Sequence, residues 1–245
     1  MKLAAIMPVA AIDLLESNYH FCFAELALQY RRYADYYREA AKTGTVIMDT
    51  MVFERKRPMP MNDWLTAIEL VCPTVVVAMD VLEDAEATKK NYRHLKQFVN
   101  CQLMPVTQGA TYSQFLECFS YFVGQSDWIA LPVQVPARRH ERFHLLELLR
   151  GLDLPSDLKI HLLGASSNTL EREHEVRDLP FIQGMDTTKP IAIALNHYIL
   201  PHCPPEASDR APYFFDTPRR ECTDEWASMR HNVEYMRGRI CSDTV

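Results

Sequence analysis

The sequence predicts an α/β protein built as one (β/α)8 TIM barrel with a C-terminal loop and helix extension. Eight short apolar stretches of strand length alternate with helix-like segments along the 245 residues, a pattern typical of a barrel of parallel strands. Chains of this length commonly form such a barrel as one unit. We therefore expect a single domain over residues 1–245, with the barrel over about 2–200 and the extension over about 201–245.

The clearest strand signal is the run TVIMD at residues 45–49, which is apolar and β-branched up to Asp49. Such a run predicts a strand buried on both faces. The same design recurs in residues 74–80, which end at Asp80, and in residues 181–186, which end at Asp186. Because the strands of a barrel have their carboxyl ends at one edge, we expect the three aspartates to lie there together.

The first half of the chain supplies four strands and the helices between them. Gly44 is a C-terminal cap signal for the helix before it, and acidic residues suit the start of the helix after Asp80. We predict strands over residues 2–7, 19–26, 45–49 and 75–80. We predict helices over about 29–43, 61–71 and 84–98.

The second half of the chain supplies the last four strands and the helices that follow them. We predict strands over residues 102–107, 128–133, 159–163 and 181–185. We predict helices over about 112–123 and 139–150, after Ser166, and from Pro190, since proline is favoured at the first position of a helix.

The composition changes after about residue 200, where prolines become frequent. We expect residues 201–220 to form a loop and a last helix to cover about 224–237. The apolar residues of this helix are spaced to pack on the barrel; they are Trp226, Met229, Val233 and Met236.

The net charge, the cysteines and the N-terminal segment limit the partners and the compartment that we expect. A formal charge of −6 gives no general attraction for polyanions, so nucleic acid would need a local basic surface. Seven cysteines spread singly along the chain show no disulfide framework and favour a reducing compartment. The first apolar run is short and is broken by Pro8. We therefore expect a cytoplasmic protein without a membrane partner.

The predicted edge gathers carboxylates and few other reactive groups. Besides the three aspartates it receives Gln108, residues 130–131 and residues 161–164. The chain carries no recognisable serine or cysteine nucleophile turn, no Gly-rich phosphate loop and no HExxH motif. What remains is chemistry in which one aspartate attacks and another moves a proton. A single aspartate at a strand end could equally cap a helix, but three at matched positions favour a site.

The order of these residues resembles the tRNA-guanine transglycosylase superfamily, most closely its compact phage-type members, the DNA 7-deazaguanine transglycosylases. The resemblance covers about residues 2–200 and rests on order and spacing. The segments that carry it are YADYYREAAKTGTVIMDTMVFE (33–54), VVVAMDVLEDAEATKKNYRHL (75–95), MPVTQG (104–109), IALPV (129–133), IHLLGA (160–165) and GMDTTKPIAIAL (184–195).

The resemblance implies a base exchange without a cofactor. Asp186 would attack C1′ of a target guanosine, expel guanine and form a covalent glycosyl-enzyme, and Asp49 would protonate the leaving base and deprotonate the incoming 7-deazaguanine. The base would be bound by Asp80, Gln108, Gly109, Ala130, Leu131 and Phe53. The implied partners are a polynucleotide, DNA rather than tRNA, whose target base leaves the stack, and the free 7-deazaguanine. A homodimer is compatible with this interpretation.

Two features depart from the family pattern. Members usually carry small residues after the first catalytic aspartate, where this chain has Thr50, Met51 and Val52. The tRNA enzymes also bind zinc through clustered Cys and His after the last aspartate. Here the corresponding cysteines are far apart and form no CxxC pair, so we expect no metal site; they are Cys203, Cys222 and Cys241.

Three basic clusters are candidates for binding phosphates, although short charge runs are as often solvated loops. They comprise Arg55, Lys56 and Arg57; Arg138, Arg139, His140 and Arg142; and Arg219 with Arg220. His161 is interpreted as a packed strand residue rather than an acid or base.

Three alternatives stay open. The polynucleotide could be tRNA. The same aspartates could serve a nucleoside deoxyribosyltransferase or an N-glycosidase, which act on small nucleosides or transfer the sugar to water. The barrel could also be a non-catalytic scaffold for nucleic acid or a partner protein, in which Met51 and Val52 have closed the pocket.

Overall fold

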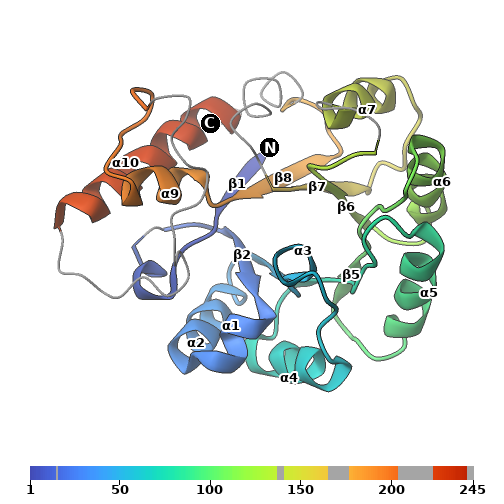
Figure 1. Ribbon diagram of the computed structural model, residues 1–245, viewed down its shortest axis with the longest axis horizontal. Helices are drawn as coiled ribbons and strands as arrows, with labels where there is room; N and C mark the ends of the chain where they lie inside the picture. The colour runs from blue at the N-terminus through green and yellow to red at the C-terminus, as the bar shows by residue number, and fades with distance from the viewer. Residues whose placement is uncertain (15, 137–140, 165–176, 204–222, 242–245) are drawn as a thin grey trace.

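The fold is mixed α/β, with two four-stranded sheets in which all paired strands run parallel. A computed structural model describes residues 1–14, 16–136, 141–164, 177–203 and 223–241. One sheet has the order β1-β8-β7-β6 and the other β2-β3-β4-β5. Helices surround the strands in the view of Figure 1.

All eight predicted strands are present. They are β1 (Lys2–Ala5), β2 (Tyr19–Phe23), β3 (Thr45–Asp49), β4 (Val75–Val77), β5 (Gln102–Met104), β6 (Trp128–Pro132), β7 (Lys159–Leu163) and β8 (Ile182–Thr187). The predicted bounds of β3 and β7 are confirmed. β4 and β5 are shorter than predicted, and beyond their paired residues they share one further bond, from the Ala78 amide to the Met104 carbonyl at 2.8 Å.

The described helices lie between these strands and after them. They are α1 (Ala24–Gln29), α2 (Arg31–Ala40), α3 (Val52–Arg55), α4 (Met61–Val71), α5 (Ala85–Leu95), α6 (Tyr112–Phe122), α7 (Glu141–Arg150), α9 (Lys189–Leu195) and α10 (Thr223–Ile240), with a 3-10 turn at Val9–Ala11. Asp84 caps α5 by accepting from the Ala87 amide at 2.9 Å, as its position predicts. The helix expected after Ser166 and most of the loop at 201–220 lie outside the described residues.

One predicted strand and helix have the wrong bounds. Residues 19–26 were expected as strand and 29–43 as one helix, but the strand ends at Phe23 and two helices follow, separated by Tyr30 in an extended conformation. At the last residue of the strand, the Phe23 amide donates to the Tyr33 hydroxyl of α2 at 3.1 Å. The residues after it, AELALQ, are good helix formers.

The two sheets adjoin at both ends. Val106, beyond β5, forms a parallel bridge with Ala130 of β6. The Ala130 amide donates to the Pro105 carbonyl at 2.8 Å, and its carbonyl accepts from the Thr107 amide at 3.0 Å. At the other end β1 lies beside β2.

The last helix packs on the protein largely as predicted. Met229, Val233 and Met236 are buried, while Trp226 is half-buried. α10 contacts α9 and β1, so it covers the sheet that holds β8 (Figure 1). None of the described helices combines the length and the apolar character that crossing a membrane requires.

Candidate active site

Three aspartates lie at the carboxyl ends of the parallel strands, and two of them act electrostatically on the third. Asp49 ends β3, Asp80 follows β4 and Asp186 is the penultimate residue of β8. The charges of Asp80 and Asp186 both raise the pKa of Asp49. Glu54 of α3 contributes to the same effect, and no pattern in the sequence indicates this role. The structure therefore brings the predicted carboxylates into one site.

Asp49 is suited to holding a proton. Although part of the residue stays accessible to solvent, the surrounding protein desolvates its carboxyl group, and this is the largest cause that raises its pKa well above the usual value. Repulsion from Glu54, Asp80 and Asp186 adds to the increase. The Thr50 amide donates to Oδ1 at 2.7 Å and opposes it. A carboxyl group in this state can act as a general acid.

Asp80 is held by Gln108, the glutamine that the sequence placed beside it. The Gln108 Nε2 donates to Asp80 Oδ2 at 2.5 Å, and Gln108 Oε1 accepts from the Glu83 amide at 3.1 Å. This second bond fixes which end of the Gln108 amide faces the carboxylate. Burial raises the pKa of Asp80 to about 6, while the bond from Gln108 lowers it. Asp80 is therefore mainly an ionised acceptor at neutral pH.

The pKa of Asp80 predicts how the stability of the protein depends on pH. The folded pKa is raised above the unfolded value, so the stabilising contribution of the bound proton is present below about pH 4 and is lost as the pH rises through about 6. At pH 7.5, ionisation of the buried Asp80 lowers the free energy of unfolding by roughly 3 kcal/mol. Asp80→Asn should remove this cost. The free energy of unfolding of the variant should therefore be about 1–3 kcal/mol higher than that of the wild type at pH 7.5.

Urea denaturation at pH 4.5 and pH 7.5 measures this difference. The gain at pH 4.5 should be about a third of the gain at pH 7.5, and the exposed Asp63→Asn should show no gain at either pH. A gain of equal size at both pH values would contradict the proton linkage at Asp80.

Asp186 is held through one of its two carboxylate oxygens. Its Oδ1 accepts from His161 Nε2 at 2.9 Å and from the Gly164 amide at 3.1 Å. Among the described residues, no hydrogen-bond donor reaches Oδ2. The residue is 5% exposed. The carboxylate is thus oriented through one oxygen, which leaves the second available to a ligand.

His161 connects Asp186 to Tyr19 of β2. The Tyr19 hydroxyl lies 2.6 Å from His161 Nδ1. Because Asp186 Oδ1 accepts, His161 Nε2 carries the proton and Nδ1 accepts from Tyr19. The imidazole stacks on Phe21, with ring centroids 5.5 Å apart. His161 is packed within the sheet as the sequence analysis expected, but it also holds a site carboxylate, which the sequence did not indicate.

Two glycines allow these contacts. A Cβ at Gly184 would lie 2.6 Å from Tyr19 Cε1 and 2.7 Å from the Lys2 carbonyl, so only glycine lets the tyrosine ring cross β8. Gly164 adopts a φ of 64°, where other residues are strained. Its carbonyl accepts from Arg142 Nη2 at 2.7 Å.

Arg142 reinforces the ends of β6 and β7. The residue is 1% exposed, and its Nη1 donates to the carbonyls of Leu131 at 3.1 Å and Leu163 at 2.6 Å. It was predicted as part of a basic surface cluster; that prediction is wrong for Arg142, because its guanidinium is buried against backbone carbonyls.

The other residues that were expected to bind the base lie in different environments. Ala130 and Leu131 are fully buried, and the amide and carbonyl of Ala130 are engaged between β5 and β6. Gly109 lies against the start of α6, where a Cβ would be 2.5 Å from the Phe115 amide nitrogen. Phe53 of α3 is half-buried. Met51, between Asp49 and α3, is 2% exposed and has a φ of 61°.

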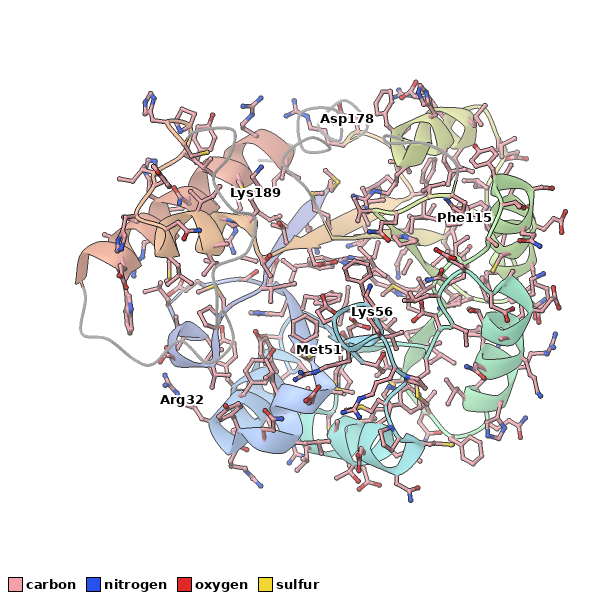
Figure 2. The ribbon with its side chains drawn as sticks, in the orientation of Figure 1. Arg32, Met51, Lys56, Phe115, Asp178 and Lys189 are labelled. Atoms are coloured by element: carbon pink, nitrogen blue, oxygen red, sulfur yellow. The ribbon has the colours of Figure 1, made fainter. Side chains whose placement is uncertain are left out.

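In the first basic cluster, which comprises Arg55, Lys56 and Arg57, one positive charge is paired with a carboxylate. Arg55 donates to both carboxylate oxygens of Glu25, at 2.7 and 2.6 Å. Lys56 Nζ lies 3.8 Å from the centre of the Phe53 ring, and Arg57 is exposed. Figure 2 labels Met51 and Lys56 near the centre of the view. Arg138, Arg139, His140, Arg219, Arg220 and Cys222 lie outside the described residues.

No protein-family model matches the chain, and no curated protein matches its sequence.

Proposed function

We propose that the protein is a transglycosylase that exchanges guanine for a 7-deazaguanine in DNA through a covalent Asp186–sugar intermediate. The observation that carries this proposal is the state of Asp186, whose Oδ1 is held by two donors while Oδ2 has none among the described residues. A carboxylate held in this way beside a second, proton-holding carboxyl group is the pair that nucleophilic sugar chemistry needs.

The proposal includes a closed (β/α)8 barrel. The two sheets adjoin at β5 and β6 through the Val106–Ala130 bridge, and at β1 and β2. These two junctions support a ring in which the strands follow their order along the chain. In such a ring the carboxyl ends of all the strands face one opening, which agrees with the convergence of Asp49, Asp80 and Asp186.

The reaction proceeds in two displacements at C1′ of the target nucleotide. Asp186 Oδ2 attacks C1′, the bond from C1′ to N9 of guanine breaks, and Asp49 gives its proton to the leaving base. The incoming 7-deazaguanine then attacks C1′ through N9, loses its N9 proton to Asp49, and the electron pair of the C1′–O bond returns to Asp186. The raised pKa of Asp49 supports its first role, since the group holds a proton where an ordinary aspartate has lost it.

Asp80 and Gln108 are suited to recognising the base. Guanine and its 7-deaza analogues present adjacent donors at N1 and N2, and burying them unpaired costs about 1–3 kcal/mol each. The ionised Asp80 accepts from such donors. Gln108 is already fixed by the Glu83 amide and Asp80, so it presents its remaining N–H in one direction. Asp80→Asn should therefore reduce selection for guanine.

The Met51 backbone gives further support. Its left-handed conformation, with φ 61° and ψ 27°, is one that glycine adopts without strain. In the family that the sequence resembles, a small residue is common at this position. The local backbone thus agrees with that family, while the methionine side chain is 2% exposed and packs in the hydrophobic core.

A second candidate is a transferase acting on small deoxynucleosides. It is favoured by the pairing of Arg55 with Glu25, which removes one of the proposed phosphate contacts. Lys56 and Arg57 remain for a polynucleotide backbone beside the Asp49 loop. For either candidate the proposed setting is the cytoplasm, which for a phage-encoded protein is that of the host.

A base-exchange assay separates these functions. Radiolabelled guanine is offered with single-stranded DNA, duplex DNA, unmodified tRNA or deoxyguanosine, and incorporation is measured for each. Label in DNA is expected, with more in single strands, because their bases need not be flipped out of a duplex. Label only in tRNA or only in the nucleoside would replace the DNA proposal, and no label in any substrate with folded protein would favour a scaffold.

A further inference from the structure

We infer that Tyr19 and His161 form a relay that holds Asp186 by Oδ1, directs Oδ2 to the sugar and assists departure of the Asp186 carboxylate from the glycosyl-enzyme. The inference rests on the proposed function for its chemical step. The hydrogen-bond arrangement itself can be tested without any substrate. Tyr19 and His161 act through Asp186 and are therefore positioning residues.

The relay joins three strands from both sheets. Tyr19 belongs to β2, His161 to β7 and Asp186 to β8. The residues are 1%, 0% and 5% exposed, and the two bonds measure 2.6 and 2.9 Å. Bonds of this length in a buried site give the carboxylate a defined orientation.

The end point of the relay connects it to the site rather than to packing alone. Buried polar side chains reduce stability unless their groups are hydrogen-bonded, so Tyr19 and His161 need the partners that they have. Here every hydrogen-bonding group of the His161 ring is used, and the Nε2 bond ends on the site carboxylate. Burial, with the charge of Asp186, raises the pKa of Tyr19 well above its usual value. The hydroxyl therefore stays protonated and remains a donor.

The direction of the relay has a chemical consequence. When Asp186 Oδ2 bonds to C1′, the carboxylate loses its negative charge and the bond from His161 weakens. When the incoming base displaces the sugar, the electron pair returns to the carboxylate and the bond strengthens again. A donor that binds the charged form better than the ester favours this second step. Loss of the relay should thus slow breakdown of the intermediate more than its formation.

The first test examines the tautomer of His161 by ¹⁵N NMR of the imidazole, with its signals assigned through ring contacts to Phe21. In the wild type we expect the form protonated at Nε2. In Tyr19→Phe the proton should stay on Nε2, because Asp186 Oδ1 still accepts it, but the unprotonated Nδ1 loses its donor and its ¹⁵N signal should move downfield. The control is Tyr33→Phe, since Tyr33 is also fully buried and its hydroxyl bonds to the Phe23 amide. An Nδ1 signal that is the same in Tyr19→Phe and the wild type would overturn the relay.

The second test measures the covalent intermediate. With guanine-containing DNA and limiting incoming base, Tyr19→Phe should slow the second step by about tenfold and raise the fraction of protein trapped on DNA. Tyr33→Phe should leave that fraction unchanged. Equal effects of both substitutions would reduce Tyr19 to a structural role. If the wild type exchanges no base in any substrate, the proposed function fails, and the NMR result alone decides whether the hydrogen-bond relay exists.

Discussion

Asp186→Asn should abolish base exchange while leaving the fold intact. The substitution replaces Oδ2, the oxygen that would attack C1′, by an amide nitrogen with no nucleophilic lone pair. We expect the rate to fall by a factor on the order of 10⁴ or more, the size seen when a member of a nucleophilic site is removed. The Asn oxygen can still accept from His161 and Gly164, so the free energy of unfolding should change by no more than about 1 kcal/mol.

Initial rates of guanine exchange and a denaturing gel for the protein–DNA adduct measure this effect. The matched control is Asp178→Asn, since that side chain is 73% exposed and lies 3.9 Å from Arg177. Figure 2 labels Asp178 at the periphery of the view. The control should exchange guanine like the wild type. A folded Asp186→Asn variant that still forms an adduct would remove Asp186 from the role of nucleophile.

Arg142→Met should cause the largest loss of stability. The methionine fills much of the same space but donates to none of the three carbonyls that Arg142 binds, at Leu131, Leu163 and Gly164. Losing these three bonds, whose acceptors are buried or partly buried, should lower the free energy of unfolding by about 3–5 kcal/mol. Because Gly164 also donates to Asp186, exchange activity should fall as well.

Urea denaturation measures the change in the free energy of unfolding. Arg150→Met, on the same helix α7, is the control, because the Arg150 side chain is 50% exposed and pairs with Glu147 at its surface. Its effect should stay within about 0.5 kcal/mol. If the two variants lose the same small amount, the bonds from Arg142 to the strand ends do not stabilise the fold.

Much of the secondary structure could be predicted because its signals are local. The apolar runs of β3 and β7 are bounded by polar or glycine residues, so their limits follow from the chain itself. The break at Tyr30 could not be predicted in this way. It accompanies a bond between the Phe23 amide and the Tyr33 hydroxyl, and such a bond leaves no periodic pattern in the sequence.

The candidate site also has some features that the sequence predicts and others that it does not. Asp49, Asp80 and Asp186 could be selected because a carboxylate at the end of an apolar strand is visible in one short segment, and Gln108 follows the next strand in the same way. Whether these residues perform base exchange stays a prediction. Their protonation could not be predicted, since the pKa of Asp49 depends on burial and on charges from other strands.

The sequence alone therefore determined the alternation of strands and helices and the strand ends at which carboxylates gather. Only the tertiary structure decided how those carboxylates are held: Tyr19 lies 142 residues from His161, and His161 lies 25 residues from Asp186. It also decided that Arg142 is interior rather than a surface cation. Local patterns record the period of a helix or a strand, whereas a contact between distant residues depends on packing that no single segment encodes.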